Sequence, residues 1–422
     1  MAASIAVFSV AAVAADIPLT LAQAQRLAIE RSRQLSAKDY AASASRELAV
    51  AAGQLPDPTL KVGIDNLPVN GPDRLSVSND FMTMRRIGVM QEFTRADKRQ
   101  RRAERYEREA EKSLAEKAQT TANIERDTAL AWLDRYYTQA MADVVSEQGA
   151  QAKLEIQAAE GAYRAGRGGQ ADIFTARSAL VAFEDRNSEI QRRVKNAKAM
   201  LVRWIGSTTD MPLAGKPAID TISLNPATLD TQLTHHPEIA VLTKQQEIAE
   251  AEAKLAEANK KTDWSVEVTY QQRGPAYSNM VSVGVSIPLQ WDQRNRQDRE
   301  LASRLAMVEQ ARAERDEMLR QHIAETRLMI NEWENNRERL GRFAHELIPL
   351  ANQRTLATIA AYRGGKSGLT DVLAARRNEI DVRLQALQLE ADTARLWAQL
   401  NFLTPSNEAH SHVPALPARE AQ

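Results

Sequence analysis

A short segment of this chain occurs twice, and that repeat constrains the fold more than any other feature. The first copy, residues 162–177, reads AYRAGRGGQADIFTAR, and the second, residues 361–376, reads AYRGGKSGLTDVLAAR. About half of the aligned positions are identical without a gap. Self-similarity at such a long period indicates a duplicated structural unit. Each copy lies between two long helical patterns, and its glycines suit the positive φ of a tight turn, so the sequence predicts two helical hairpin tips.

The same order of elements surrounds both copies. In the first half, apolar spacing and alternation predict a helix (19–52), a strand (59–65), a weaker strand (86–93), a long helix (94–160), the first tip and a further helix (171–204). After a proline-containing linker, the second half predicts a helix (234–261), two strands (264–270 and 281–288), a long helix that Pro349 should kink or break, the second tip and a helix ending near 404. The chain is therefore expected to be mainly α with a small β part, built from a duplicated helix–strand–strand–helix unit.

The duplication also sets the expected domain boundaries. Residues 1–15 combine a short apolar run with small residues before Asp16, which fits a signal-peptide remnant. The other expected regions are a first repeat (16–210), a linker (211–225), a second repeat (226–404) and a disordered tail (405–422).

Charge and cysteine content exclude several classes of function. The 55 basic and 55 acidic residues give a net charge of zero, so nothing favours nucleic-acid binding. The chain has no cysteine, which excludes disulfides, thiol catalysis and thiolate metal sites, and suits export to an oxidising compartment. Only 5% of the residues are aromatic, and the excess of Ala, Glu, Gln, Arg and Leu is typical of long helices.

The four predicted strands are two-faced, since apolar and polar residues alternate along them. After the N-terminal residues 1–15, no apolar run approaches the roughly 20 residues of a transmembrane helix. If the protein spans a membrane, it must therefore use its strands. Four strands cannot close a barrel and an open edge is unstable in lipid, so several copies would have to pool their strands; a trimer would give twelve. The residues expected to face lipid are Leu60, Val62, Ile64, Trp264, Val266, Val268, Tyr270, Val281, Val283, Val285 and Ile287.

Several segments make the sequence resemble the TolC-type outer-membrane efflux factors. They are Leu55-Pro56-Asp57-Pro58-Thr59-Leu60 before the first strand, the strand 88–93 running into Arg95-Ala96-Asp97-Lys98-Arg99, and both Ala-Tyr-Arg tips. The resemblance covers about residues 19–404. The Pro-Asp-Pro and Asp-Lys-Arg segments are most similar to the branch that serves heavy-metal exporters of the resistance-nodulation-division type.

This resemblance implies a homotrimer with a 12-stranded transmembrane β-barrel in the outer membrane, continuous with a long α-helical barrel across the periplasm. It implies a passive exit duct for substrates, with heavy-metal cations expected. The implied partners are outer-membrane lipid, a periplasmic adaptor (membrane fusion) protein and an inner-membrane resistance-nodulation-division pump. No cofactor and no nucleic acid is implied.

The resemblance also implies roles for the two tips. In the family, the second tip closes the periplasmic entrance by hydrogen bonds and ion pairs; Tyr362 and Asp371 fall on matching positions, with Arg363 and Lys366 alongside. This sequence departs from the family where a basic residue is replaced by Ser367 and a second acidic position by Ala374. The residues expected to contact the adaptor are Gly166, Arg167, Gly168, Gly169, Gly364, Gly365, Ser367 and Gly368.

Two enzyme-like signals are set aside on chemical grounds. Residues 364–367, Gly-Gly-Lys-Ser, lack the glycine that a phosphate-binding loop needs at position 360, which is Ala360, and no strand precedes them. No set of nucleophile, base and orienting group emerges anywhere, so an enzyme is not expected.

The histidines are also interpreted without a metal. Adjacent histidines at a helix start point apart, so His235 and His236 are expected to be a solvated helix start. His410 and His412 could bind a metal ion loosely, but a disordered tail is the favoured interpretation. No metal site is therefore predicted.

Two functions from different classes stay open at this point. One is a transport conduit, and the other is a soluble periplasmic coiled-coil scaffold without a pore. The stripe of Trp264, Val266, Val268 and Tyr270 discriminates between them. A conduit needs this stripe to face lipid, whereas a scaffold must bury it.

Overall fold

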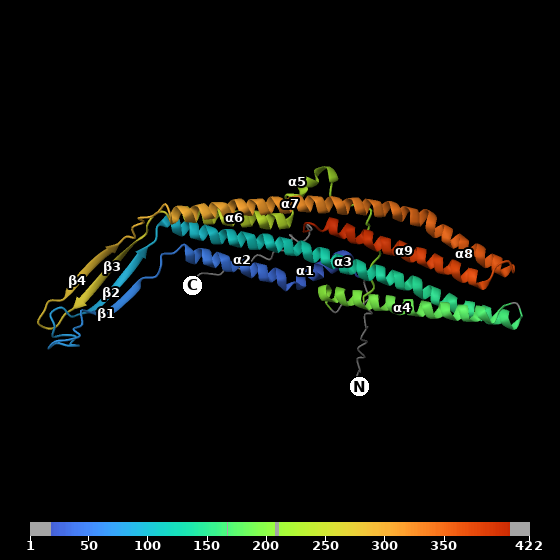
Figure 1. The fold of residues 1–422 in the computed structure, drawn as a ribbon, viewed down its shortest axis with the longest axis horizontal. Coiled ribbons are helices and arrows are strands. Elements are labelled where there is room, and N and C mark those ends of the chain that lie inside the picture. Colours follow the sequence, from blue (N-terminus) through green and yellow to red (C-terminus); the bar gives the residue numbers. More distant parts are fainter. Residues whose placement is uncertain (1–17, 167, 207–210, 406–422) are drawn as a thin grey trace, which may run out of the picture. The chain divides into compact units, whose positions relative to one another are not determined.

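The computed structural model describes residues 18–166, 168–206 and 211–405 (Figure 1). This part of the chain is mainly helical and contains one four-stranded antiparallel sheet. None of its helices combines the length and the apolar character of a membrane span. The predicted signal-peptide remnant (1–15) and almost all of the predicted tail (405–422) lie outside the described residues.

The first half of the chain follows the predicted order of elements. Its elements are α1 (Leu21–Arg31), α2 (Arg33–Ala52), β1 (Thr59–Asp65), β2 (Met84–Phe93), α3 (Ala96–Arg164) and α4 (Gln170–Ile205). The single helix predicted for 19–52 is wrong in one respect, because it is interrupted at Ser32. Ser32 has an extended ψ of 114° and its hydroxyl accepts a hydrogen bond from Leu35 N at 3.4 Å, so it ends α1 and caps α2.

The second half repeats this order and adds two short elements, η2 and η3. Its elements are η2 (Pro226–Thr228), α5 (Leu229–Leu233), α6 (Pro237–Ala258), β3 (Trp264–Gln272), β4 (Met280–Ser286), α7 (Gln297–Arg342), the π-turn η3 (Phe343–Leu347), α8 (Ile348–Arg363) and α9 (Leu369–Asn401). The kink or break predicted at Pro349 takes the form of a π-turn, which joins α7 to α8 without a gap in the helix. Proline cannot donate the helical hydrogen bond and its ring crowds the carbonyl four residues earlier, so the helix widens into the π-turn immediately before it.

The elements form two compact units. The tip unit comprises the described residues within 1–35, 118–236 and 321–422, and the sheet unit comprises residues 36–117 and 237–320. Both units contain segments from the first and the second half of the chain.

The sheet joins the two halves of the chain strand by strand. Its order is β1-β2-β3-β4, so β2 from the first half pairs with β3 from the second (Figure 1). The register aligns apolar side chains across all four strands in two rows. These rows are Leu60–Val89–Val268–Val283 and Val62–Ile87–Tyr270–Val281.

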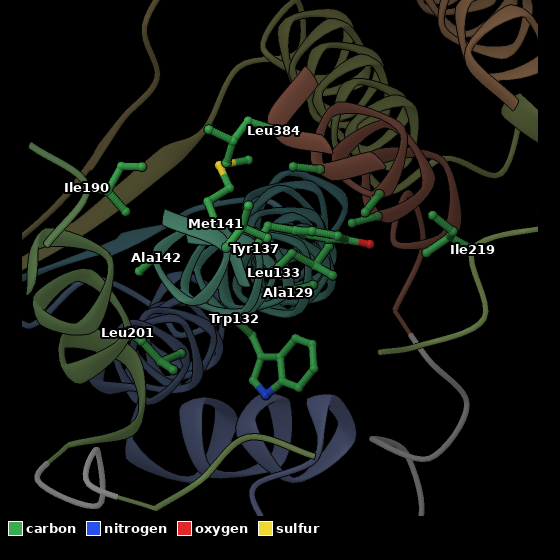
Figure 2. Packing of buried hydrophobic residues seen from close by; sticks show 14 of the residues in the cluster. Ala129, Trp132, Leu133, Tyr137, Met141, Ala142, Ile190, Leu201, Ile219 and Leu384 are labelled. Carbon is green, nitrogen blue, oxygen red and sulfur yellow. The ribbon is translucent and has the colours of Figure 1, made fainter. Parts of the chain in front are cut away.

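The core of the tip unit surrounds α3. Trp132 is fully buried there, and Figure 2 shows it with Tyr137 and Met141 from α3 and Leu384 from α9. The Trp132 indole donates a hydrogen bond from Nε1 to the Leu19 carbonyl at 3.1 Å. A buried backbone carbonyl needs such a partner, so the indole fixes the N-terminal segment against the core.

A second indole on α7 makes the equivalent contact in the other half. Trp333, 4% exposed, donates from Nε1 to the Ile219 carbonyl at 3.2 Å. Leu19 also bridges to Leu213 in parallel, so the N-terminal segment and the linker lie side by side. Two tryptophans at comparable places on the two long helices thus anchor the two irregular segments of the tip unit.

Candidate functional site

Both tips contain a glycine of positive φ whose N–H donates to the carbonyl of the repeated tyrosine. At the second tip, Gly365 has a φ of 69°, its N–H donates to the Tyr362 carbonyl at 3.0 Å, and Lys366 N donates to the Ala361 carbonyl at 2.9 Å. These two bonds satisfy the last carbonyls of α8 in a Schellman arrangement. At the first tip, Gly166 has a φ of 66° and its N–H donates to the Tyr163 carbonyl at 3.0 Å. The repeated glycines are therefore explained by the turn.

The repeated aspartates start the helices that follow. Asp172 accepts a hydrogen bond from Gly169 N at 2.9 Å, and Asp371 accepts one from Gly368 N at 3.1 Å. Each carboxylate lies in the first turn of its helix, where it also interacts favourably with the helix dipole. The Asp371 side chain remains exposed.

The two tips differ in how their tyrosines pack. Tyr362 is half-buried against a small cluster that includes Ala159, Ala176 and Leu369, which joins the two hairpins of the tip unit. Tyr163, its counterpart in the first repeat, is 48% exposed. The second tip is thus held against the first by its own tyrosine, whereas the first presents its tyrosine to the surroundings.

The predicted tip residues are largely at the surface. Arg363 and Lys366 are exposed at the end of α8, and the partly buried Ser367 donates from Oγ to the Thr358 carbonyl at 3.4 Å. Arg167 lies outside the described residues. Of the predicted adaptor-contact residues, Gly168 is half-buried, and the exposed members are Gly166, Gly169, Gly364, Gly365 and Gly368.

The second candidate surface is the apolar face of the sheet. Val62 is 72% exposed and Val283 is 69% exposed, so aliphatic side chains of this face contact solvent in the single chain. Val266 is half-buried, and Ile287 follows β4 rather than lying within it. The other exposed residues that were predicted for this face are Leu60, Ile64, Trp264, Val268, Tyr270, Val281 and Val285.

Two further residues of this face were not predicted. Ile87 and Val89 in β2 are 51% and 49% exposed, and they occupy the same two apolar rows. The alternation in 86–93 was the available signal, but the arginines at 85 and 86 and the glycine between the two apolar residues weaken it.

The opposite face of the sheet is polar and ion-paired. Lys61 and Glu267 are 2.7 Å apart, and Arg86 and Asp65 are 3.6 Å apart. Thr269 between them is 5% exposed. A sheet with one aliphatic face and one charged face separates an apolar from an aqueous environment.

Comparison with solved structures identifies this arrangement. The outer-membrane channel OprN matches with a TM-score of 0.76 at 18% identity, covering 92% of this chain and 90% of that one. The outer-membrane protein VceC from Vibrio cholerae gives 0.72 at 18% identity, with 91% and 95% covered. The Campylobacter jejuni CmeC outer-membrane channel gives 0.74 at 12% identity, with 91% and 85% covered. The chain has a TolC-like fold.

No protein-family model and no curated protein sequence matches the chain. The TolC-like fold is shared with OprN over 92% of this chain at 18% identity.

The Asp-Lys-Arg segment, residues 97–99, lies in the first turn of α3. Lys98 is 4% exposed, and its Nζ lies 2.8 Å from Asp263 Oδ2, just before β3. Arg99 Nη1 donates to the Gly53 carbonyl at the end of α2, at 3.1 Å. Partial burial raises the pKa of Asp263, but the hydrogen bonds from Lys98 Nζ and Arg95 N, together with the positive charges of Lys98 and Arg102, hold that pKa below its usual value. This junction fixes the start of α3 to both neighbouring segments.

Proposed function

We propose that this protein is the outer-membrane channel of a tripartite efflux system. In this proposal it lies in the bacterial outer membrane, extends into the periplasm and acts as a passive exit duct rather than an enzyme. The observation that carries the proposal is the sheet, whose exposed aliphatic face continues across all four strands. The TolC-like fold supports it, since the matched proteins include outer-membrane channels.

The open edges of the sheet support a homotrimer. Within the described residues, β1 pairs only with β2 and β4 only with β3, so each chain has two strand edges to satisfy. In lipid, unpaired backbone groups cost several kcal/mol each, about 2–7 by transfer measurements. Three chains that pair β4 with the next β1 would close a barrel of twelve strands, within the range of outer-membrane barrels.

The tips are proposed as the periplasmic entrance and the docking surface. Tyr362, Arg363, Lys366 and Asp371 would hold the closed state by contacts between subunits. The exposure of Arg363, Lys366 and Asp371 supports this role, because groups at a closing rim must reach a neighbour. The glycines of both tips would contact a periplasmic adaptor, which connects the channel to an inner-membrane pump of the resistance-nodulation-division type.

Heavy-metal cations are the proposed substrates. The support is the likeness of the Pro-Asp-Pro and Asp-Lys-Arg segments to the branch that serves heavy-metal exporters. A deletion strain complemented with this protein should regain tolerance to such cations, but not to organic antimicrobials, if this assignment is right. Restored tolerance to organic compounds alone would contradict it.

Cell fractionation followed by planar-bilayer recording tests the channel proposal. The full-length protein should pellet with outer membranes, require detergent for extraction and give discrete conductance steps. A monodisperse monomer that is soluble without detergent would instead support a periplasmic coiled-coil scaffold without a pore.

A further inference from the structure

Two histidines far apart in the sequence lie together in the tip unit. His236 immediately precedes α6, and His322 is on α7. Their ring centroids are 4.6 Å apart with an interplanar angle of 37°, and a ring nitrogen of one lies within 4.8 Å of a ring nitrogen of the other. His236 is 8% exposed, while His322 is half-buried. One imidazole is thus enclosed by protein, and the other borders solvent.

We propose that His236 and His322 form a binding site for a divalent transition metal of the zinc type. Imidazole nitrogen is the commonest protein ligand for Zn²⁺, at about 2.0–2.1 Å from the metal. Two such ligands around a tetrahedral ion are about 3.3 Å apart. In the proposed site, the half-buried His322 ring rotates to bring the two nitrogens to this separation, and water completes the coordination from the open side.

The charge state of the pair suits a metal. Burial lowers the pKa of His236 to about 4, with further lowering by His322 and Arg126, so its ring is neutral at neutral pH. Arg126 is a cation that would oppose a metal ion. It is ion-paired with Asp127 at 3.1 Å, which offsets much of its charge.

The site would brace the tip unit. His236 ends the segment that includes α5, and this segment already contacts α7 through Arg327 and Asp230, whose Nη2 and Oδ1 atoms are 2.7 Å apart. That ion pair is exposed and contributes little. A metal bridging His236 and His322 adds a second, stronger link between the same two segments. This inference does not depend on the channel function.

Zinc titration of the full-length protein tests the site. The protein, purified in detergent without a histidine tag, is titrated with ZnCl₂ by calorimetry, together with His236→Gln, His322→Gln and the control His235→Gln. His235 neighbours the site in sequence, but its side chain is exposed, with Nδ1 3.3 Å from the Thr231 carbonyl. We expect the wild type and the control to bind one zinc ion per chain, and each of the other variants to bind at least about tenfold more weakly.

Chemical modification of histidines in the wild type tests the site without any variant, so it also applies if a variant does not fold. Diethyl pyrocarbonate modifies accessible histidines, and mass spectrometry locates the modified peptides. Zinc should protect His322 and leave His235 reactive. Equal reactivity of His322 with and without zinc, or equal zinc affinity of all the folded variants, would overturn the proposal.

Discussion

At the scale of single residues, the two tip aspartates show which role is structural, the helix cap that both share, and which would be functional, the gating proposed for Asp371 alone. Asp172 and Asp371 make the same capping bond to a glycine N–H, at 2.9 and 3.1 Å. That shared bond explains why the aspartate recurs in both repeats without any reference to a gate. A gating role for Asp371 therefore has to come from its charge, which the cap does not require.

Asparagine at position 371 distinguishes these roles. Asp371→Asn keeps an oxygen that can cap the helix but removes the charge, whereas Asp371→Ala removes both and costs about 1 kcal/mol of helix stability. If the charge holds the proposed gate closed, both variants should raise the open probability in planar bilayers. Asp172→Asn, the matched change at the first tip, should leave it unchanged. An increase with Asp371→Ala alone would assign the effect to the cap.

His236 should make stability depend on pH. Burial, His322 and Arg126 lower its pKa from 6.5 to about 4 in the folded chain. Between these values the unfolded chain binds a proton that the folded chain does not, so stability falls as the pH falls from 6.5 towards 4. The slope is at most about 1.4 kcal/mol per pH unit. Urea unfolding of zinc-free protein at neutral and acidic pH measures it, and His236→Gln should flatten the dependence while His235→Gln retains it.

At the scale of elements, the sequence pattern correctly predicted the features that depend only on residues close together in the chain. Strand alternation placed β1 and β3 correctly, and Pro349 marked the π-turn between α7 and α8. The interruption at Ser32 was missed because serine is only mildly unfavourable within a helix, and its capping bond to Leu35 is visible only once both helices are placed. The alternation also did not predict which strands would pair, because β2 from the first half pairs with β3 from the second half.

The two faces of β4 should tolerate charge differently. Val283 pairs with Val268 on the aliphatic face, and Ser282 pairs with Thr269 on the polar face. In a membrane barrel, Val283→Arg should cost roughly 2–4 kcal/mol near the bilayer midplane. Ser282→Arg places the same charge on the aqueous side. Outer-membrane yields of the two variants measure the difference, and equal yields would contradict the proposed lipid face.

The junction below the sheet should depend on Lys98. Its ion pair with Asp263 is largely buried, with side chains 5% and 17% exposed. Lys98→Met removes the charged partner of the Asp263 carboxylate and leaves only its hydrogen bond from Arg95 N, and such a loss typically costs about 3 kcal/mol or more. Lys117→Met, on the same helix, breaks a pair whose side chains are 36% and 51% exposed, and should cost at most about 1 kcal/mol. Denaturant midpoints compare the two, and equal losses would show that burial is not the cause.

At the scale of the whole molecule, long-range proximity was the part that sequence could not supply. Nothing near His236 in the sequence points to His322, and nothing in the tip segments indicates that Tyr362 packs against Ala159 and Ala176. Such contacts depend on which helices become neighbours, whereas the duplicated order of elements can be recognised in the sequence. The fold class was therefore predictable, and the histidine pair was not.

The proposed trimer can be tested by cross-linking, because the chain has no cysteine of its own. A double variant with Val62→Cys in β1 and Val283→Cys in β4 places one thiol near each edge of the sheet. A flexible bis-maleimide should then join neighbouring chains in outer membranes into dimers and closed trimers. Either single variant should give no trimer, since it can join two chains at most. A ladder that continues beyond three chains would contradict a closed trimer.

The π-turn at Phe343–Leu347 also determines the direction in which the side chains of α8 point. A π-turn holds one residue more than the α-helix it interrupts, and one residue corresponds to about 100° of rotation about the helix axis. Every side chain of α8, up to Arg363 at the tip, therefore points along an azimuth set by this one extra residue. Deleting a single residue here would leave the tip sequence intact and turn it to face a different neighbour. The phase of the helix, as well as its residues, determines what the tip can touch.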